Sequence, residues 1–384
     1  LQPDNPRFYV NDTGTGNTLN LSHPFVLRMV LDSLRFWVEH MGIDGFRFDL
    51  ATTLAREAGG FNQDGGFLNA LRQDPVLRNV RLIAEPWDIG LGGYQLGQFP
   101  PEFGEWNDQF RDTVRRFWRG DSNSAQDLGS RLLGSADRFD HSARTASTSI
   151  NFVSAHDGFT LADTVAFKHR HNVANTEDNR DGHHTNFSDN CGVEGPTDDA
   201  VILRKRLQRQ RNMLATQFFS QGAPMLLAGD EYGNSQNGNN NAYCQDNPIG
   251  WLNWDQADAD LLAFVQKLSE FRALHPALRQ PQFLHGTPRK SDGLQNVRWS
   301  DFDDHPLNWN DPKLSQICVT LRCQHAAEND AVFIAINRSG KDATVTLPKD
   351  ATWVKRVDTA LSPEAALTLV KADSVVAFVQ ETPV

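Results

Sequence analysis

Apolar residues recur at helical spacing in several segments of the first 280 residues, and short apolar runs lie between these segments. The segment 24–41 is typical, since its apolar residues return every three or four positions, Pro24 suits a first helical turn and Gly42 ends the pattern. Further helices are predicted over 65–73, 108–118, 124–133, 199–220 and 256–274. Buried strands are predicted over 45–50, 80–84, 148–155 and 223–231, and acidic residues lie at their carboxyl ends.

The predicted strand 45–50 carries polar residues on one face and apolar residues on the other. Phe46, Phe48 and Leu50 share one face, and Arg47 and Asp49 share the opposite one. An unpaired buried charge costs several kcal/mol, so an ordinary buried strand would not carry these two charges. A barrel strand explains the pattern, because its charged face can point into the barrel mouth. A buried Arg–Asp ion pair that only fixes packing explains this strand equally well.

After about residue 280 the chain changes to short β-type runs separated by turn residues, which predicts a small antiparallel β-sandwich over 280–384. The earlier alternation of strand and helix is typical of an α/β fold, the (β/α)8 TIM barrel, whose site lies at the carboxyl ends of the strands. Only about five of eight strands are found. Residues 1–279 are therefore interpreted as the C-terminal portion of the barrel, about strands 4 to 8, with the first strands expected upstream of Leu1.

Composition narrows the class of protein. The 384 residues carry a net charge of −11, which argues against a nucleic-acid or anionic-membrane partner, and no apolar run is long enough to span a bilayer. The four cysteines have no CxxC or zinc-ligand spacing. They are interpreted as free thiols of a reducing compartment, which predicts a cytoplasmic location.

Three carboxylates, Asp49, Glu85 and Asp157, lie at the ends of three different predicted strands. Such a set fits acid/base chemistry, for example retaining glycoside hydrolysis with one nucleophile and one proton donor. Arg47 could keep Asp49 ionised, and His156 could donate a hydrogen bond to a sugar hydroxyl. A divalent metal site is the alternative reading of the same residues.

Metal binding fits the sequence less well than acid/base chemistry. No HxH or HExxH pattern accompanies the three acids, and the pair His183–His184 lies in a long polar stretch where solvated side chains are more common than ligands. The sequence therefore predicts no metal and no cofactor.

The motifs around the three acids resemble those of the α-amylase superfamily, glycoside hydrolase family 13. Residues 45–49 (GFRFD) are similar to its nucleophile motif, 83–87 (IAEPW) to its acid/base motif and 152–157 (FVSAHD) to the motif of its third carboxylate. The three occur in the family's order. Further stretches are similar to bacterial glycogen debranching enzymes of the isoamylase type; these are 105–108 (EWND), 179–182 (NRDG), 229–231 (GDE) and 239–246 (NNNAYCQD).

The resemblance implies a role for each matched residue. Asp49 would form the covalent glycosyl-enzyme, Glu85 would protonate the leaving oxygen and then activate water, and Asp157 would bind sugar hydroxyls and favour ring distortion. The residues implied to bind substrate are Arg47, His156, Trp87, Trp106 and Asn107. The two tryptophans and the Asn-rich loop could equally serve loop packing.

The implied function is retaining hydrolysis of α-1,6 branch linkages in glycogen, limit dextrin or another branched α-glucan. Two alternatives stay open, namely another α-glucan hydrolase or transglycosylase of the superfamily and a non-catalytic glycan-binding protein on the same fold. The family also has an earlier motif with an Asp and a His on its third barrel strand, and an N-terminal β-sandwich. Neither is found in this sequence, which is therefore expected to be N-terminally incomplete.

Overall fold

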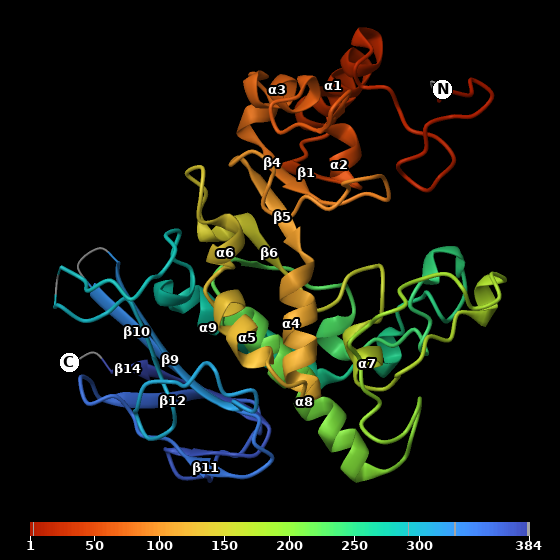
Figure 1. Ribbon diagram of the computed structural model, residues 1–384. Helices are drawn as coiled ribbons and strands as arrows, with labels where there is room; N and C mark the ends of the chain where they lie inside the picture. The colour runs from red at the N-terminus through yellow and green to blue at the C-terminus, as the bar shows by residue number, and fades with distance from the viewer. Residues whose placement is uncertain (3, 291, 326–327, 382–384) are drawn as a thin grey trace. The chain divides into compact units, whose positions relative to one another are not determined.

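The computed structural model describes residues 1–384 except 3, 291, 326–327 and 382–384 (Figure 1). The chain forms two compact units, each assembled from two stretches of sequence. The first unit holds Leu1–Asn107 and Asp137–Ile150, and the second holds Asp108–Ala136 and Asn151–Val384. The domains 1–279 and 280–384 were inferred from the change of sequence pattern, and this division stays a prediction.

A parallel sheet forms the centre of the first unit. It contains β1 (Gly45–Phe48), β4 (Arg81–Ala84) and β5 (Phe103–Asn107) in this order, and β6 (Ser149–Asn151) follows next to β5. Phe48 lies opposite Ala84, and Ala84 lies opposite Glu105, so the carboxyl ends of β1, β4 and β5 lie at one edge of the sheet. Asp49 and Glu85 are the first residues beyond the ends of β1 and β4.

The backbones of β1 and β4 approach each other closely at Gly45. A Cβ atom at this position would lie 2.3 Å from the carbonyl oxygen of Arg81, far inside van der Waals contact. Next to this contact the two backbones form a regular hydrogen bond, in which the amide of Arg81 donates to the carbonyl oxygen of Asp44 at 3.0 Å. Only glycine fits between these strands without moving one of them.

Helices and short strands complete the first unit. They are α1 (Pro24–Glu39), α2 (Ala51–Leu54), β2 (Arg56–Glu57), β3 (Gly60–Phe61), α3 (Gly66–Gln73) and the 3₁₀ turn Leu77–Asn79. One face of α1 packs on the core through Leu27, Val30, Leu31, Leu34 and Val38. Met29, Trp37 and Met41 belong to the same helical pattern of apolar residues, which predicts that they are buried, but they are exposed. The predicted helix is confirmed within two residues, but its buried face is narrower than the sequence pattern indicates.

The second unit joins a helical layer to an antiparallel sheet. Its longer helices are α4 (Asp108–Arg119), α5 (Ser124–Leu132), α8 (Ala200–Phe219) and α9 (Ala259–Leu274), and its shorter elements before the sheet include α7 (Leu161–Thr164) and β7 (Ala223–Pro224). The sheet has the order β12 (Trp353–Asp358), β14 (Ser374–Gln380), β10 (Glu328–Asn337), β9 (Gln316–His325) and β8 (Val297–Ser300). The two-stranded sheet β11 (Ala343–Thr344) with β13 (Leu369–Val370) accompanies it. The remaining helix, α6 (Ala136–Phe139), begins at the boundary between the units.

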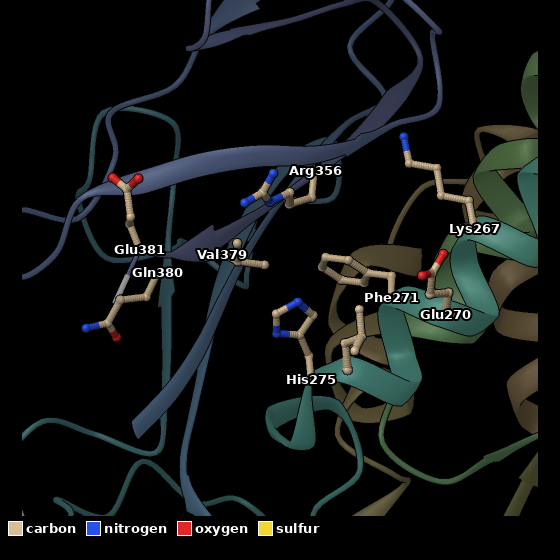
Figure 2. A pocket seen from close by; sticks show the side chains of 9 residues that line it. Lys267, Glu270, Phe271, His275, Arg356, Val379, Gln380 and Glu381 are labelled. Atoms are coloured by element: carbon tan, nitrogen blue, oxygen red, sulfur yellow. The ribbon is translucent and has the colours of Figure 1, made fainter. Parts of the chain in front are cut away.

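Both faces of this antiparallel sheet are buried. One face packs against the helices; Figure 2 shows Phe271 of α9 facing Val379 of β14, and both side chains belong to one core cluster. The other face carries Phe333, Trp353 and Phe378, which pack with residues of β11 and β13. Alternating strand residues therefore enter two different cores, which explains why the strands are almost continuously apolar. The α/β fold with an antiparallel β domain, predicted from the sequence, is confirmed.

The main differences concern strand ends. The strand predicted over 45–50 stops at Phe48, because Leu50 adopts a left-handed conformation. The strand predicted over 148–155 covers 149–151, and the one predicted over 223–231 covers 223–224 before a 3₁₀ turn at Asp230–Tyr232. The four cysteines are unpaired, as expected. No helix in the described part of the chain is long and apolar enough to cross a membrane.

The first unit's core provides a stability test. Leu71 of α3 is fully buried, whereas Leu91 in the loop after β4 is 98% exposed. Leu71→Ala should lower the free energy of unfolding by about 2–5 kcal/mol, because it removes buried methyl groups and leaves a cavity. Leu91→Ala should change it by less than about 0.5 kcal/mol. Urea unfolding followed by circular dichroism measures both, and equal effects of the two substitutions would contradict this description of the core.

Candidate active site

A tight turn after β1 brings the backbone amides of Leu50 and Ala51 into hydrogen-bond contact with Glu85. Leu50 has φ 41° and ψ 51°, a conformation that non-glycine residues seldom adopt. The amide of Leu50 donates to Oε2 of Glu85 at 2.6 Å, and the amide of Ala51 donates to the carbonyl oxygen of Glu85 at 2.9 Å. The strained turn thus holds the acid at the end of β4 directly beside the end of β1.

Arg47 connects the two acids at this edge of the sheet. Its Nη1 donates to Oδ1 of Asp49 at 2.7 Å, and its Nη2 lies at an ion-pair distance of 2.9 Å from Oε2 of Glu85, without the geometry of a hydrogen bond. The side chain of Asp49 is 72% exposed, and that of Glu85 is 6% exposed. One guanidinium therefore contacts an accessible carboxylate and a buried one.

The environment of Glu85 favours its protonated form. Burial raises its pKa from 4.5 to about 7, and the nearby charge of Asp49 acts in the same direction. The Leu50 amide and the Arg47 charge oppose this shift but do not cancel it. A carboxyl group with a pKa near 7 can donate a proton at neutral pH, as a general acid must. The position of Glu85 could be predicted from the sequence, but the size of this pKa shift could not.

Trp106 lies on the guanidinium of Arg47. Its ring centroid is 4.2 Å from Cζ of Arg47, which is a cation–π distance. Trp106 is half-buried on β5, one residue from the buried Asn107, whose Nδ2 donates to Oγ of Ser149 at 2.8 Å. The structure therefore brings Trp106 to the two acids through Arg47, and places Asn107 inside the sheet.

The loop that begins at Trp87 is fastened at several points. Trp87 itself is half-buried. The next residue, Asp88, accepts two hydrogen bonds from Arg56, from Nε at 2.7 Å and from Nη2 at 2.6 Å. Farther along, the amide of Gly97 donates to Glu105 at 2.6 Å. These contacts fix the loop whether or not Trp87 touches a substrate.

Glu105 shows that a raised pKa does not by itself identify a proton donor. Burial raises its pKa to about 7, as for Glu85. However, Glu105 is completely buried, pairs with Arg144 at 2.9 Å and accepts the amide of Gly97. It can therefore hold the loop and the strand together, but no substrate can reach it.

Asp157 and His156 belong to the second unit, beyond the end of β6. Nε2 of His156 lies 3.5 Å from Oδ2 of Asp157, and both side chains are about half exposed. Asp49 and Glu85 belong to the first unit, so the convergence of all three carboxylates stays a prediction.

His183 is a candidate site residue, although the sequence pattern favours a solvated side chain at this position. Its side chain is partly buried, and burial together with the nearby charge of Arg111 lowers its pKa, which Asp157 partly offsets. A Cβ atom at Gly158 would lie 3.7 Å from its Nδ1, so His183 adjoins the turn that follows Asp157. The sequence did contain a signal for His183. The 179–182 motif, which resembles the debranching enzymes, lies directly before this histidine.

The Asn-rich loop is held by its own side chains. Asn240 is buried, and its Oδ1 accepts a hydrogen bond from Nδ2 of Asn172 at 2.8 Å, while its amide donates to Oδ1 of Asn172 at 3.0 Å. The carbonyl oxygen of Asn240 accepts the amide of Gly158 at 3.0 Å. The loop therefore supports the segment next to Asp157, which favours the packing role over a direct substrate role.

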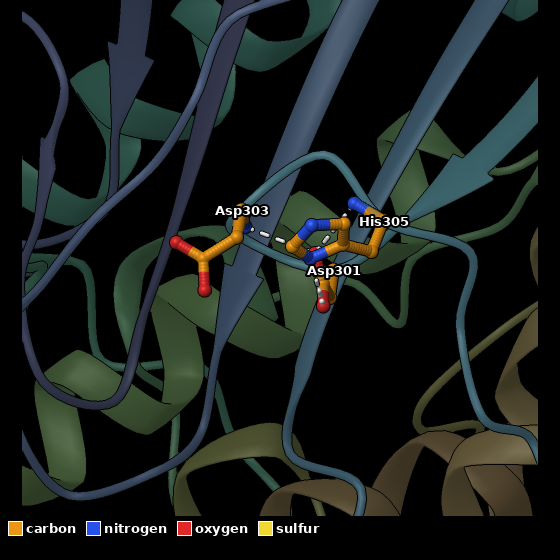
Figure 3. Close-up of side chains that lie close together, drawn as sticks. All are labelled: Asp301, Asp303 and His305. Carbon is orange, nitrogen blue, oxygen red and sulfur yellow. Dashed lines mark hydrogen bonds and ion pairs between the residues drawn. The ribbon is translucent and has the colours of Figure 1, made fainter.

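One group of three possible metal ligands occurs among the described residues, namely Asp301, Asp303 and His305 (Figure 3). Oδ1 of Asp301 accepts the amides of Asp303 at 2.9 Å and of His305 at 2.8 Å. This carboxylate thus stabilises its own turn, and the group adjoins neither Asp49 nor Asp157 in sequence. The absence of a metal from the reaction stays a prediction.

No family model matches this sequence. It is 52% identical over 296 residues to the glycogen operon protein GlgX homolog of Mycobacterium tuberculosis, an alignment that covers 76% of this chain and 41% of the relative. It is 47% identical over 345 residues to a glycogen debranching enzyme of Salmonella schwarzengrund, covering 89% of this chain and 50% of the relative. The chain thus spans half or less of the length of these curated relatives.

Solved structures share the fold at lower sequence identity. A pullulanase of Paenibacillus barengoltzii in complex with maltotetraose superimposes with a TM-score of 0.71 at 21% identity, covering 99% of this chain and 54% of the pullulanase. The type I pullulanase of Bacillus subtilis in complex with maltose gives a TM-score of 0.71 at 22% identity, covering 97% and 49%. The sequence matches support the assignment to a family, and the solved structures support the fold. The chain therefore belongs, as a homologue of bacterial glycogen debranching enzymes, to the α-amylase superfamily, glycoside hydrolase family 13.

Proposed function

We propose that the protein is a retaining glycoside hydrolase that cleaves α-1,6 branch linkages of glycogen or limit dextrin. The observation that carries the proposal is the contact of one guanidinium, that of Arg47, with an exposed acid and a buried acid of raised pKa. Retaining glycosidases need this difference between their two carboxyl groups. The names of the relatives, glycogen debranching enzyme and glycogen operon protein, favour a branched α-glucan as substrate.

The two acids would divide the chemistry between them. The carboxylate of Asp49 attacks the anomeric carbon of the branch glucose, the bond from this carbon to the O6 atom of the main chain breaks, and Glu85 gives its proton to O6. A covalent ester between Asp49 and the glucose results. Glu85, now ionised, then takes a proton from water while the water oxygen attacks the same carbon. The ester bond to Asp49 breaks in this step, which releases the branch and restores both acids.

The remaining residues would support this chemistry. Arg47 would stabilise the ionised Glu85 after the first step, when Asp49 is esterified and carries no charge. Asp157 and His156 would bind sugar hydroxyls, and Trp87 would contact the glucan. We assign Trp106 and Asn107 supporting roles, on Arg47 and inside the sheet, which differ from the direct substrate contact that the sequence suggested. The unpaired cysteines support a cytoplasmic location.

Product analysis tests the reaction. Incubation with a phosphorylase-limit dextrin should release short linear maltooligosaccharides, because α-1,6 bonds at the branch points break. Asp49→Asn should reduce the rate by about a thousandfold or more while glucan binding persists, because the amide cannot act as the nucleophile. Asp44→Asn, at an exposed acid just before β1, is the matched control and should keep the rate.

Three results would contradict this proposal. Cleavage restricted to α-1,4 bonds of linear chains would exclude debranching. Transfer of the released chain to another sugar instead of water would identify a transglycosylase. A near-native rate in Asp49→Asn would show that another residue is the nucleophile.

The raised pKa of Glu85 sets the expected pH dependence. The proton donor must be protonated in the free enzyme, so kcat/KM should fall about tenfold per pH unit as the pH rises above about 7. In Asp49→Asn the midpoint for Glu85 should move down, because the negative charge that raises this pKa is gone. Carbon-13 NMR of labelled glutamate follows Glu85 in both proteins. An unchanged midpoint, or a rate that stays constant between pH 7 and 9, would exclude Glu85 as the donor.

A further inference from the structure

The loop that carries His156 and Asp157 is buried except at these two residues. It runs from the end of β6 to the start of α7 without regular secondary structure. Within 151–160 His156 and Asp157 are exposed, and every other residue is buried. The polar backbone groups of a buried loop have to find partners elsewhere in the chain. The position of the two exposed side chains therefore depends on the contacts that hold this loop.

Arg115 of α4 holds the loop on both sides of its exposed residues. Its Nε donates to the carbonyl oxygen of Val153 at 2.7 Å, and its Nη2 donates to that of Phe159 at 3.2 Å. Its Nη1 donates to the carbonyl oxygen of Asn186 at 3.0 Å, three residues after His183. One guanidinium thus connects the two ends of the loop with each other and with the neighbouring polar stretch.

Asp230, in the 3₁₀ turn after β7, holds the same loop at two further points. Its Oδ2 accepts a hydrogen bond from Oγ of Ser154, and its Oδ1 accepts the amide of Leu161 at 2.9 Å. Asp230 is 1% exposed and Arg115 is 2% exposed. Burial raises the pKa of Asp230 to about 7, and the nearby charge of Arg115 partly offsets this shift. Two buried charged groups that influence each other therefore hold one loop.

The burial of Arg115 is costly, and packing alone does not explain it. Burial lowers the pKa of Arg115 to about 9, so the guanidinium is still charged at neutral pH, and its three hydrogen bonds go to uncharged carbonyl oxygens. An apolar side chain of similar volume would fill the same space without the cost of desolvating a charge. It would lack the planar, forked set of donors that fixes three carbonyl groups at defined positions. The arginine therefore contributes geometry to the loop in addition to packing.

We propose that Arg115 and Asp230 are positioning residues for hydrolysis, which hold the loop in the shape that presents its two exposed residues to the glucose unit at the cleaved bond. The inference rests on the proposed function, from which it takes the sugar-binding roles of His156 and Asp157. The four hydrogen bonds to the loop lie in pairs, two before the exposed residues and two after them. Because Arg115 and Asp230 are buried, they act through the loop and not on the substrate.

Arg272 of α9 offers a matched control. It is 7% exposed, and like Arg115 it donates to three carbonyl oxygens, in this case those of Phe218, Ser220 and Gly222. None of these three acceptors belongs to the 153–161 loop. Arg115→Lys and Arg272→Lys therefore make the same chemical change in similar surroundings. If Arg115 only stabilised the fold, the two substitutions would have the same consequences.

Turnover of a phosphorylase-limit dextrin and hydrogen exchange followed by mass spectrometry test the proposal together. Arg115→Lys should lower kcat about a hundredfold and change KM less than about threefold, because a displaced loop mainly weakens contacts that form in the transition state. The amides of 153–161 should exchange faster in this variant, since the loop opens more often. Arg272→Lys should keep kcat within about twofold of the original value and should leave exchange at 153–161 unchanged.

Asp230 supplies a second pair of variants, which includes a conservative rescue. Asp230→Asn keeps an acceptor for the amide of Leu161 and can donate to Oγ of Ser154, whereas Asp230→Ala removes both contacts. Asp230→Asn should therefore retain at least about a third of kcat, and Asp230→Ala should lose about as much as Arg115→Lys. Circular dichroism checks the folding of each variant, and the Asp230 pair decides the result if Arg115→Lys fails to fold.

Several outcomes would overturn the proposal. Equal losses of kcat in Arg115→Lys and Arg272→Lys would show a general effect on stability. Unchanged exchange at 153–161 in Arg115→Lys and Asp230→Ala would show that neither residue holds the loop, and a near-native kcat with faster exchange would show that the loop geometry does not matter for the reaction. If the unaltered protein does not cleave limit dextrin, the proposed function fails. The exchange measurements then still decide whether the two residues hold the loop, so the two proposals fail separately.

Discussion

Arg47 forms ion pairs with two neighbouring acids that differ in burial, the exposed Asp49 and the buried Glu85. Without a cation between them, Asp49 and Glu85 would repel each other whenever both were ionised, and a small change in spacing would alter both. With Arg47 present, the difference in exposure distinguishes the two acids, because water solvates the charge of Asp49 whereas burial disfavours a charge on Glu85. The Leu50 turn, the Trp106 ring and the pairing of β1 with β4 all act by keeping this guanidinium and its two partners in place.

The alternation of the strand 45–50 was enough to predict that Arg47 and Asp49 share a face, and Pro86, which cannot donate to a sheet ladder, was enough to predict that the strand 80–84 ends beside Glu85. These are local properties, since side-chain direction follows the strand period and proline cannot continue a ladder. The left-handed Leu50 could not be predicted, because the hydrogen bonds that compensate for its strain come from a residue 35 positions away. The packing of Trp106 on Arg47 likewise depends on strand order, which the sequence pattern does not contain.

The comparison of Glu85 with Glu105 shows a second limit of sequence reasoning. Glu85 directly follows the parallel strand β4, Glu105 lies in the middle of the parallel strand β5, and burial raises both pKa values to about 7. They differ in their neighbours, since Glu105 is enclosed by Arg144 and the loop amides, whereas Glu85 shares its cation with an exposed acid. Similarly, the asparagines of the 239–241 segment look like a binding loop in the sequence, but the side-chain oxygen of Asn240 accepts a hydrogen bond from Asn172 inside the loop packing. Only three-dimensional neighbours separate supporting polar residues from reactive ones.

Gly45 has no side-chain functional group, yet it determines how closely β1 approaches β4, and therefore how closely Asp49 and Glu85 lie together. Its missing side chain lets β1 lie against the Arg81 carbonyl, and this contact is three residues before the end of the strand that carries Asp49. A methyl group at position 45 would push β1 away from β4 and would change the distance between Asp49 and Glu85 at the ends of these strands. Natural or designed variants of this chain should therefore tolerate change at position 45 as poorly as at the acids themselves, although nothing that binds at the site would touch it.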